Sequence, residues 1–225
     1  MFDWQKIITD KNFRSDPIPH FRVENVLSDD IYTELLETYN SSWDATDGYG
    51  VITPECTGIS DVWRQFADSA YHDIPAKMLE PYFDYEHPDW FVSACALSYH
   101  HHDPDDGNIK PGELIRDWHQ DGDSKFFNSI YYLGSESLGH IELKNTQTGA
   151  ELSYEYSGNS ILIWRNWMPD SSYLHQFRNS QSGPRRTVYL CWAPKTDYYI
   201  DAAGHSIDPE TSRHLKKLIR YQGLS

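Results

Sequence analysis

The chain has few cysteines, no long apolar run and no leader-like start, and each shortage excludes a class of protein. Cys56, Cys95 and Cys191 are odd in number, widely spaced and form no CxxC pair. This argues against a disulfide framework or a zinc ribbon and favours reduced thiols. No apolar run approaches the roughly 20 residues of a membrane span. Residues 1–6 lack the basic and apolar pattern of a secretory signal, so we expect a cytoplasmic protein that does not enter a membrane.

Positive charge is also scarce, with 19 Lys and Arg against 34 Asp and Glu and a formal net charge of −15. Non-specific nucleic-acid binding depends on neutralising phosphates with Lys and Arg, so no nucleic-acid partner is expected. The charge is compatible with a peptide, protein or small-molecule substrate and indicates no oligomeric state. The 225 residues, 39% hydrophobic and 15% aromatic, fit one globular domain, because β-rich folds reach this size undivided.

The first part of the chain, to about residue 88, has mostly helical periodicity and no internal repeat. A short strand within 16–27 leads into a helix capped by Ser28. A second helical stretch starts after Ser60 and continues, after an interruption at Pro75, towards Tyr82. We expect these helices to cover one outer face of a β core.

From about residue 90 to 195 apolar residues recur at every second position, which is typical of β-strands. Turn-rich links separate eight short candidate strands, and this spacing favours a sandwich or a jelly-roll barrel. A C-terminal helix, with Pro209 in its first turn, is predicted at about 208–222. The candidate strands are residues 91–99, 113–121, 126–133, 140–144, 151–156, 160–165, 172–178 and 186–193.

His-x-Asp occurs three times, and only one copy lies at the end of a predicted strand. His87-Pro-Asp89 lies in a turn, because a residue before proline is kept out of regular pairing geometry. His101-His-Asp103 is followed by Pro-Asp-Asp-Gly, which would leave the carboxylate at a loop tip. His119 and Asp121 stand at positions i and i+2 of a strand end and would project from the same face. His175 lies inside a later predicted strand and can face the same interior.

Two imidazoles and one carboxylate are the ligands of a non-haem Fe(II) site that leaves adjacent coordination positions open. Arg185, ten residues after His175, could hold the far carboxylate of a bound acid. Taken alone, His119 and Asp121 fit a solvated strand end, and His175 fits a hydrogen-bonded core histidine. Their joint arrangement with Arg185 favours the metal site. The histidine run at 100–102 is interpreted as part of a mobile acidic loop and not as a second metal site.

These residues resemble the prolyl-4-hydroxylase-like branch of the Fe(II)/2-oxoglutarate dioxygenases over most of the chain. The resemblance implies a mainly β fold with flanking helices and a double-stranded β-helix core of the jelly-roll, cupin-like kind. It also implies a hydroxylase that uses Fe(II), 2-oxoglutarate and O2, and it leaves ascorbate open as a further cofactor. The matching segments are 17–28, 94–99, 129–134, 139–143 and 158–164.

The resemblance implies a role for each candidate residue. His119, Asp121 and His175 would hold Fe(II), Arg185 would pair with the 5-carboxylate of 2-oxoglutarate, and Thr187, Tyr132 and Tyr99 would line the cosubstrate pocket. The chain departs from the branch in a longer link between Tyr99 and His119, and in Gly139-His140 where Gly-Gly is usual.

The identity of the cosubstrate arginine stays open at this point. The branch's Arg-x-Ser/Thr pattern selects Arg185 with Thr187, whereas alignment on Trp192 selects Arg186. Strand alternation allows only one of the two to face inward.

Other functions are compatible with the same sequence. A cupin-like metal isomerase or a non-catalytic ligand-binding jelly roll would keep the two histidines and the aspartate but would not need an inward arginine. An interaction protein could present the eight Trp and sixteen Tyr residues as a surface, although such aromatics more often pack in cores and on sheet faces. The substrate is not indicated, because a fold does not fix it.

Overall fold

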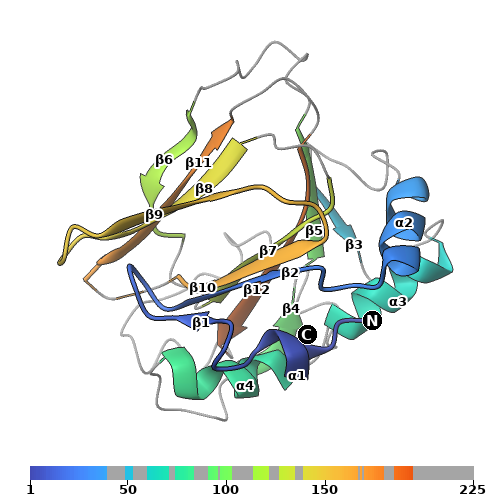
Figure 1. Cartoon of the computed structure of the whole chain (residues 1–225), viewed down its shortest axis with the longest axis horizontal. Helices are drawn as coiled ribbons and strands as arrows, with labels where there is room; N and C mark the ends of the chain where they lie inside the picture. Colours follow the sequence, from blue (N-terminus) through green and yellow to red (C-terminus); the bar gives the residue numbers. More distant parts are fainter. Residues whose placement is uncertain are drawn as a thin grey trace.

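Two antiparallel sheets facing each other form the body of the protein, and helices cover the outer side of the larger one (Figure 1). The computed structural model describes residues 1–39, 49–52, 60–70, 74–83, 91–95, 97–102, 114–121, 127–134, 139–166, 168, 170–179 and 185–194. The C-terminal helix predicted at 208–222 lies outside these residues. In the part described, no helix is long and apolar enough to cross a bilayer.

The larger sheet is built from segments far apart in the sequence. Its strands are β1 (Phe13–Arg14), β2 (His20–Glu24), β3 (Tyr49–Ile52), β4 (Phe91–Cys95), β5 (Leu97–His102), β7 (Phe127–Tyr132), β10 (Ser160–Arg165) and β12 (Arg185–Pro194). They follow the order β1-β2-β10-β7-β12-β5-β3, and β4 pairs separately with β12. The smaller sheet has the order β6-β11-β8-β9. Its strands are β6 (Leu114–His119), β8 (Gly139–Asn145), β9 (Glu151–Glu155) and β11 (Tyr173–Asn179).

The central strands of the larger sheet are buried on both faces, because their residues alternate between two separate cores. In β7, Tyr131 packs in the core under the helices, and Ile130 and Tyr132 pack in the core between the sheets. In β10, Ile163 and Trp164 divide in the same way. A strand covered on both sides has a nearly continuous apolar sequence, which explains the run from Ile161 to Trp164. The mainly β, jelly-roll core predicted from the sequence is confirmed.

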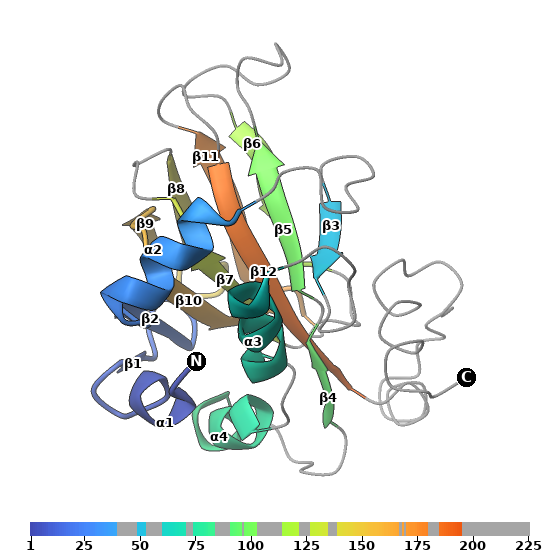
Figure 2. The same ribbon diagram turned by 90° about the vertical axis from the view of Figure 1, so that its right-hand side faces the viewer.

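The helices are α1 (Trp4–Ile7), α2 (Asp29–Glu37), α3 (Asp61–Ala70) and α4 (Ile74–Phe83), and they lie against the outer face of the larger sheet (Figure 2). The predicted N-cap of α2 is confirmed in position: Ser28 is extended, and its carbonyl accepts the Tyr32 N–H at 2.9 Å. Its side chain makes no capping hydrogen bond.

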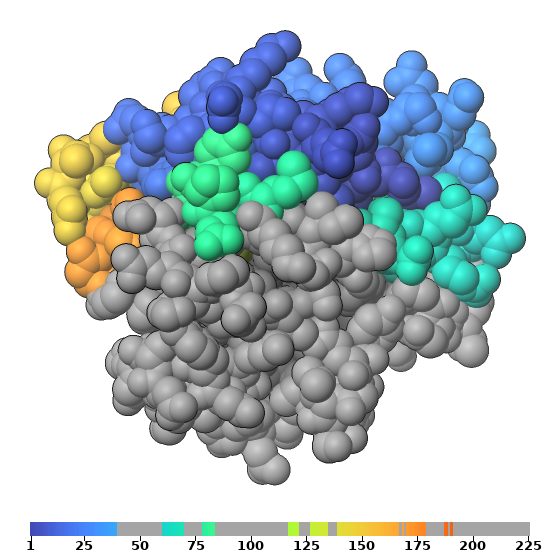
Figure 3. Space-filling model, turned by 90° about the horizontal axis from the view of Figure 1, so that it is seen from below, coloured from blue at the N-terminus to red at the C-terminus, as the bar shows by residue number. Residues whose placement is uncertain are grey.

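The N-terminus completes the core under the helices. The Phe2 ring lies 4.9 Å from that of Phe66 in α3 and 5.6 Å from that of Tyr131 in β7, measured between ring centroids. Figure 3 shows the N-terminal residues in blue beside the surfaces of α3 and α4. Because the helices and the N-terminus pack against its outer face, the larger sheet is a rigid support for the residues on its inner face.

Two sequence-based expectations are corrected. Residues 100–102 are not a loop: they continue β5, paired with Thr187, Arg186 and Arg185 of β12. The pairing is possible because β12 begins early enough to meet them. The first part of the chain also holds more strands than predicted: β2 confirms the strand expected within 16–27, whereas β1 and β3, which join the same sheet, were not predicted. The four-residue β3 carries Gly50, a residue depleted in strands, so its sequence gives little sign of a strand.

Asn159 provides a test of how the sheet holds the start of α2. It has a left-handed backbone (φ 54°), its amide exchanges hydrogen bonds with the backbone N–H and carbonyl of Leu27, and it accepts the Tyr131 hydroxyl at 3.2 Å. Because buried partners would be left unsatisfied, we expect Asn159→Ala to lower the free energy of unfolding by about 2–4 kcal/mol. Urea denaturation measures this.

Asn159→Gly is the matched control. Glycine adopts the left-handed conformation without strain but lacks the amide, so its loss of stability should be smaller than that of Asn159→Ala by up to about 1 kcal/mol. If both variants unfold at the wild-type urea concentration, the amide does not hold the two segments together.

Candidate metal centre

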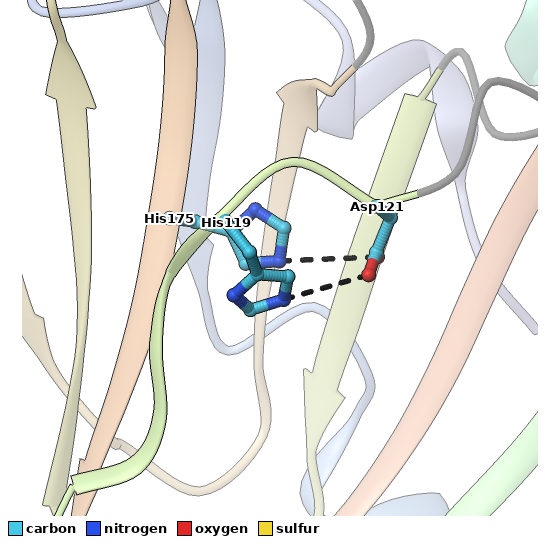
Figure 4. A group of neighbouring side chains, drawn as sticks. All are labelled: His119, Asp121 and His175. Carbon is cyan, nitrogen blue, oxygen red and sulfur yellow. Dashed lines mark ion pairs between the residues drawn. The ribbon is translucent and has the colours of Figure 1, made fainter. Parts of the chain in front are cut away.

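His119, Asp121 and His175 converge between the two sheets (Figure 4). Their ligand atoms all lie within 4.8 Å of one another. His119 is the last residue of β6, and His175 stands directly opposite it in β11. Both Nε2 atoms face the carboxylate, at 3.5 Å from Oδ1 for His119 and 3.8 Å from Oδ2 for His175.

The protonation of His119 suits metal binding. Its Nδ1 lies 2.6 Å from the carbonyl oxygen of Asp117, and a carbonyl can only accept, so Nδ1 carries the proton. Nε2 then presents a lone pair. This nitrogen is buried and has no hydrogen-bond partner in the described part of the chain. A buried acceptor without a partner is costly, and a metal ion would satisfy it, so the site fits a metal.

His175 is enclosed by aromatic rings. Its ring lies 4.2 Å from that of His119, 5.1 Å from that of Trp164 and 5.4 Å from that of Phe177, between centroids. The residue is only 1% exposed. Such packing fixes the ring and keeps water from the inner side of the centre.

The strand that carries His175 is braced from its other face. Gln176 and Arg178 of β11 both hydrogen-bond Glu142 of β8, the latter through Nε at 3.1 Å. Burial raises the pKa of Glu142, but these two hydrogen bonds outweigh it and hold the pKa below the ordinary value. The carboxylate therefore stays charged and ties the two strands together.

His20 of β2 shows what an inward histidine without a metal role looks like. Its Nδ1 lies 2.8 Å from the carbonyl oxygen of Ile18 and its Nε2 lies 2.7 Å from the Tyr154 hydroxyl, so both ring nitrogens are satisfied. Burial lowers its pKa. His119 differs in having one buried nitrogen with no such partner.

Asp121 reaches the centre from outside the strand. The predicted strand 113–121 ends at His119, so simple i, i+2 alternation does not place the carboxylate. Side-chain amides hold it instead. Asn166 accepts the Asp121 backbone N–H at 3.3 Å and donates to the Asp121 carbonyl at 3.4 Å. Asn128 of β7 donates to Oδ2 of Asp121 at 2.7 Å.

Two of the predicted cosubstrate residues are neighbours on the inner side of the larger sheet. Thr187 of β12 pairs with Tyr132 of β7 in the ladder, and the two residues are 3% and 2% exposed. The Thr187 hydroxyl has no hydrogen-bond partner among the described residues. The Tyr132 ring stacks on Tyr156 at 4.8 Å.

The other predicted pocket residues are placed only by their backbone. Arg185 and Arg186 begin β12, opposite His102 and His101 of β5, and Tyr99 pairs with Val188. Their side chains lie outside the described part, so their roles stay predictions.

Some residues of the centre were not found from the sequence. Asn128, Asn166 and Gln120 are amides without any motif; Gln120 directly precedes Asp121, whereas Asn128 lies in β7 and Asn166 directly follows β10, the strand paired with β7. Gln120 exchanges two hydrogen bonds of 3.1 Å with the backbone of Met168. Arg22 of β2 also lies inside, its guanidinium carbon 5.6 Å from the Tyr132 ring centroid. The alternation of side chains in β2 could have indicated that Arg22 points inward, because its neighbour Phe21 packs on the helix side.

No family model and no curated protein matches the chain, but solved structures do. The dioxygenase for auxin oxidation 1 of Arabidopsis thaliana, solved with 2-oxoglutarate, matches with a TM-score of 0.59 and 15% identity over 93% of this chain and 94% of that one. A prolyl hydroxylase of Trichoplax adhaerens, in complex with a hypoxia inducible factor peptide, gives 0.55 and 11% over 84% and 88%. A Pseudomonas putida prolyl-4-hydroxylase gives 0.51 and 11% over 77% and 91%.

At such identities the likeness establishes the architecture and leaves the substrate open. It agrees with the two facing antiparallel sheets. The chain therefore has the fold of the 2-oxoglutarate- and Fe(II)-dependent oxygenases, with prolyl-4-hydroxylases among its structural neighbours.

Proposed function

We propose that the protein is an Fe(II)- and 2-oxoglutarate-dependent dioxygenase that hydroxylates an unactivated C–H bond of a peptide, protein side chain or small molecule. The observation that carries this proposal is the convergence of two Nε2 atoms and one carboxylate within 4.8 Å, between the sheets of an oxygenase fold. Such a set of two imidazoles and one carboxylate suits ferrous iron with open coordination positions.

His119 and His175 would hold the metal through Nε2, and Asp121 through its carboxylate. When bound, Fe(II) with 2-oxoglutarate and O2 supplies the oxidising power, as the cosubstrate is converted to succinate and CO2. The protein's own part is to bind, orient and exclude water. The Asp117 carbonyl keeps the His119 proton on Nδ1, and Trp164 and Phe177 shield His175.

The far carboxylate of 2-oxoglutarate would lie against β12 and the end of β7. Thr187 and Tyr132 are adjacent there on the inner face, and both can donate a hydroxyl hydrogen bond to an anion. Position 185 stands two residues before Thr187, and residues at i and i+2 share a face of a strand. Position 186 alternates instead with Val188, which packs in the helix-side core. This favours Arg185 as the anchor, through a bidentate contact.

The proposal includes a peptide or protein as substrate. This is supported by a structural neighbour, a prolyl hydroxylase that was solved with a peptide bound. The cytoplasmic location, the lack of a nucleic-acid partner and any use of ascorbate stay predictions from the sequence.

Removing one histidine ligand tests the metal centre. We expect anaerobic Fe(II) and 2-oxoglutarate to give a weak visible charge-transfer band with the wild-type protein, and His119→Ala to abolish it. Turnover, measured as 2-oxoglutarate-dependent succinate release, should fall by more than about 100-fold, because losing a metal ligand reduces activity more than losing a residue that only orients a ligand.

His140→Ala is the matched control, because His140 lies on β8 and contacts Glu142, away from the three candidate ligands. It should keep the band and the turnover. A wild-type protein that binds a divalent metal through His119 without releasing succinate would favour a cupin-like isomerase or a non-catalytic jelly roll.

Adjacent tyrosines of β7 test the cosubstrate site. Tyr132→Phe removes an inward hydroxyl, and we expect it to weaken 2-oxoglutarate binding by about 1.5–3 kcal/mol, the net value of a hydrogen bond to a charged group. Fe(II) binding should stay within about twofold, because the metal ligands are untouched. Tyr131→Phe, whose hydroxyl contacts Asn159 under the helices, should leave cosubstrate binding unchanged. Equal effects of the two changes would place the site elsewhere.

Replacing each arginine by methionine decides between Arg185 and Arg186. Arg185→Met should weaken anaerobic binding of 2-oxoglutarate by about 2–5 kcal/mol, since it leaves a buried carboxylate without its partner. Arg186→Met should have a small effect. The reverse result would assign the anchor to Arg186, and two small effects would point to another cation.

A further inference from the structure

The carboxylate of Asp121 is not held by its own strand but by an amide from the opposite sheet. Asn128 lies in the middle of the larger sheet, is fully buried, and donates from Nδ2 to Oδ2 of Asp121 at 2.7 Å. The distance is that of a strong hydrogen bond to an ionised acceptor. The orientation of the amide is fixed, because only its nitrogen can donate to a carboxylate.

The backbone around Asp121 is held by amides as well. Asn166 makes two hydrogen bonds to the backbone of residue 121, and Gln120 makes two to that of Met168. Three side-chain amides therefore fix both the peptide and the carboxylate after β6 has ended. The carboxylate cannot rotate without breaking its contact to Asn128.

We propose that Asn128 is a positioning residue that reserves Oδ2 of Asp121 and leaves Oδ1 as the single oxygen ligand of the metal. Oδ1 lies 3.5 Å from Nε2 of His119, whereas Oδ2, which lies 3.8 Å from Nε2 of His175, already accepts the hydrogen bond from Asn128. A carboxylate binding through both oxygens would occupy an additional coordination position. The facial arrangement needs these positions open for its cosubstrate. The inference rests on the metal centre proposed above and adds the reason why Asp121 would bind the metal through one oxygen only.

The test uses Co(II) in place of Fe(II), because Co(II) is stable in air and its visible absorption reports ligand geometry. We expect Asn128→Leu, of similar size but without a donor, to raise the Kd for Co(II) about 10–100-fold, as is typical when a group that orients a ligand is lost. The shape of the Co(II) absorption should change as the carboxylate turns. A role in packing alone would move neither quantity.

Ser129→Ala is the matched control. Ser129 is the next residue of β7 and equally buried, and it pairs with Ile163 and Leu190, which pack in the helix-side core. Its Co(II) affinity should stay within about twofold of wild type, because it does not contact a ligand. Asn128→Ala is a second variant in case leucine prevents folding, which circular dichroism and thermal unfolding of the metal-free protein would reveal.

The wild-type protein gives an independent measurement. The infrared difference spectrum on adding Co(II) should show a wider separation of the two carboxylate stretching bands than in free aspartate, the sign of binding through one oxygen. A narrowed separation, or Asn128 variants with wild-type affinity and absorption, would overturn the inference. If wild-type protein binds no Co(II), or His119→Ala binds it equally well, the proposed centre itself fails, so the two failures are distinguishable.

Discussion

The antiparallel pairing of β6 with β11 is the interaction on which the centre depends. It sets His119 opposite His175, and residues directly opposite in such a pair bring their side chains into contact. A slip of one residue in either strand would turn one imidazole to the other face of the sheet. The register is held by the continuous pairing of β11 with β8, by the Glu142 contacts of Gln176 and Arg178, and by the packing of Phe177 in the inner core.

The larger sheet contributes rigidity because each central strand serves two cores. In β7, Tyr131 secures the strand to the helical layer, while Asn128 and Tyr132 face the opposite sheet. A side chain on such a strand has little freedom, since both faces are closely packed. The rigid strand β7 contacts Asp121 through Asn128 near one end and pairs with Thr187 through Tyr132 at the other. The distance between the metal ligands and the cosubstrate residues would therefore be set by the length of β7 between these two positions.

Much of this could be predicted from the sequence, because the relevant signals are local. Period-two alternation identified most of the strands. Strand ends alone do not single out His119, because His101 also lies in a strand, β5, that ends at His102. Contacts between distant segments were not predictable: the amides of Asn128 and Asn166 have no motif, and their role follows only from the order β10-β7 in the sheet. The extension of β5 through residue 102 likewise depends on its partner β12. The strand end after His119 was misplaced because Asp121, an irregular residue held by side-chain hydrogen bonds, looks like a strand residue in sequence.

The choice of neutral amides around Asp121 has an electrostatic reason. A lysine or arginine at position 128 would also fix the carboxylate, but its charge would offset the negative charge that attracts a divalent cation, and it would repel that cation at close range. A hydroxyl would be too short to reach across from the sheet to Oδ2. An apolar side chain would leave a buried carboxylate oxygen without this donor, which is costly. Asparagine donates one hydrogen bond and adds no charge. The carboxylate therefore stays oriented and electrostatically available, and the same amide that stabilises the metal-free fold also prepares the centre for its ion.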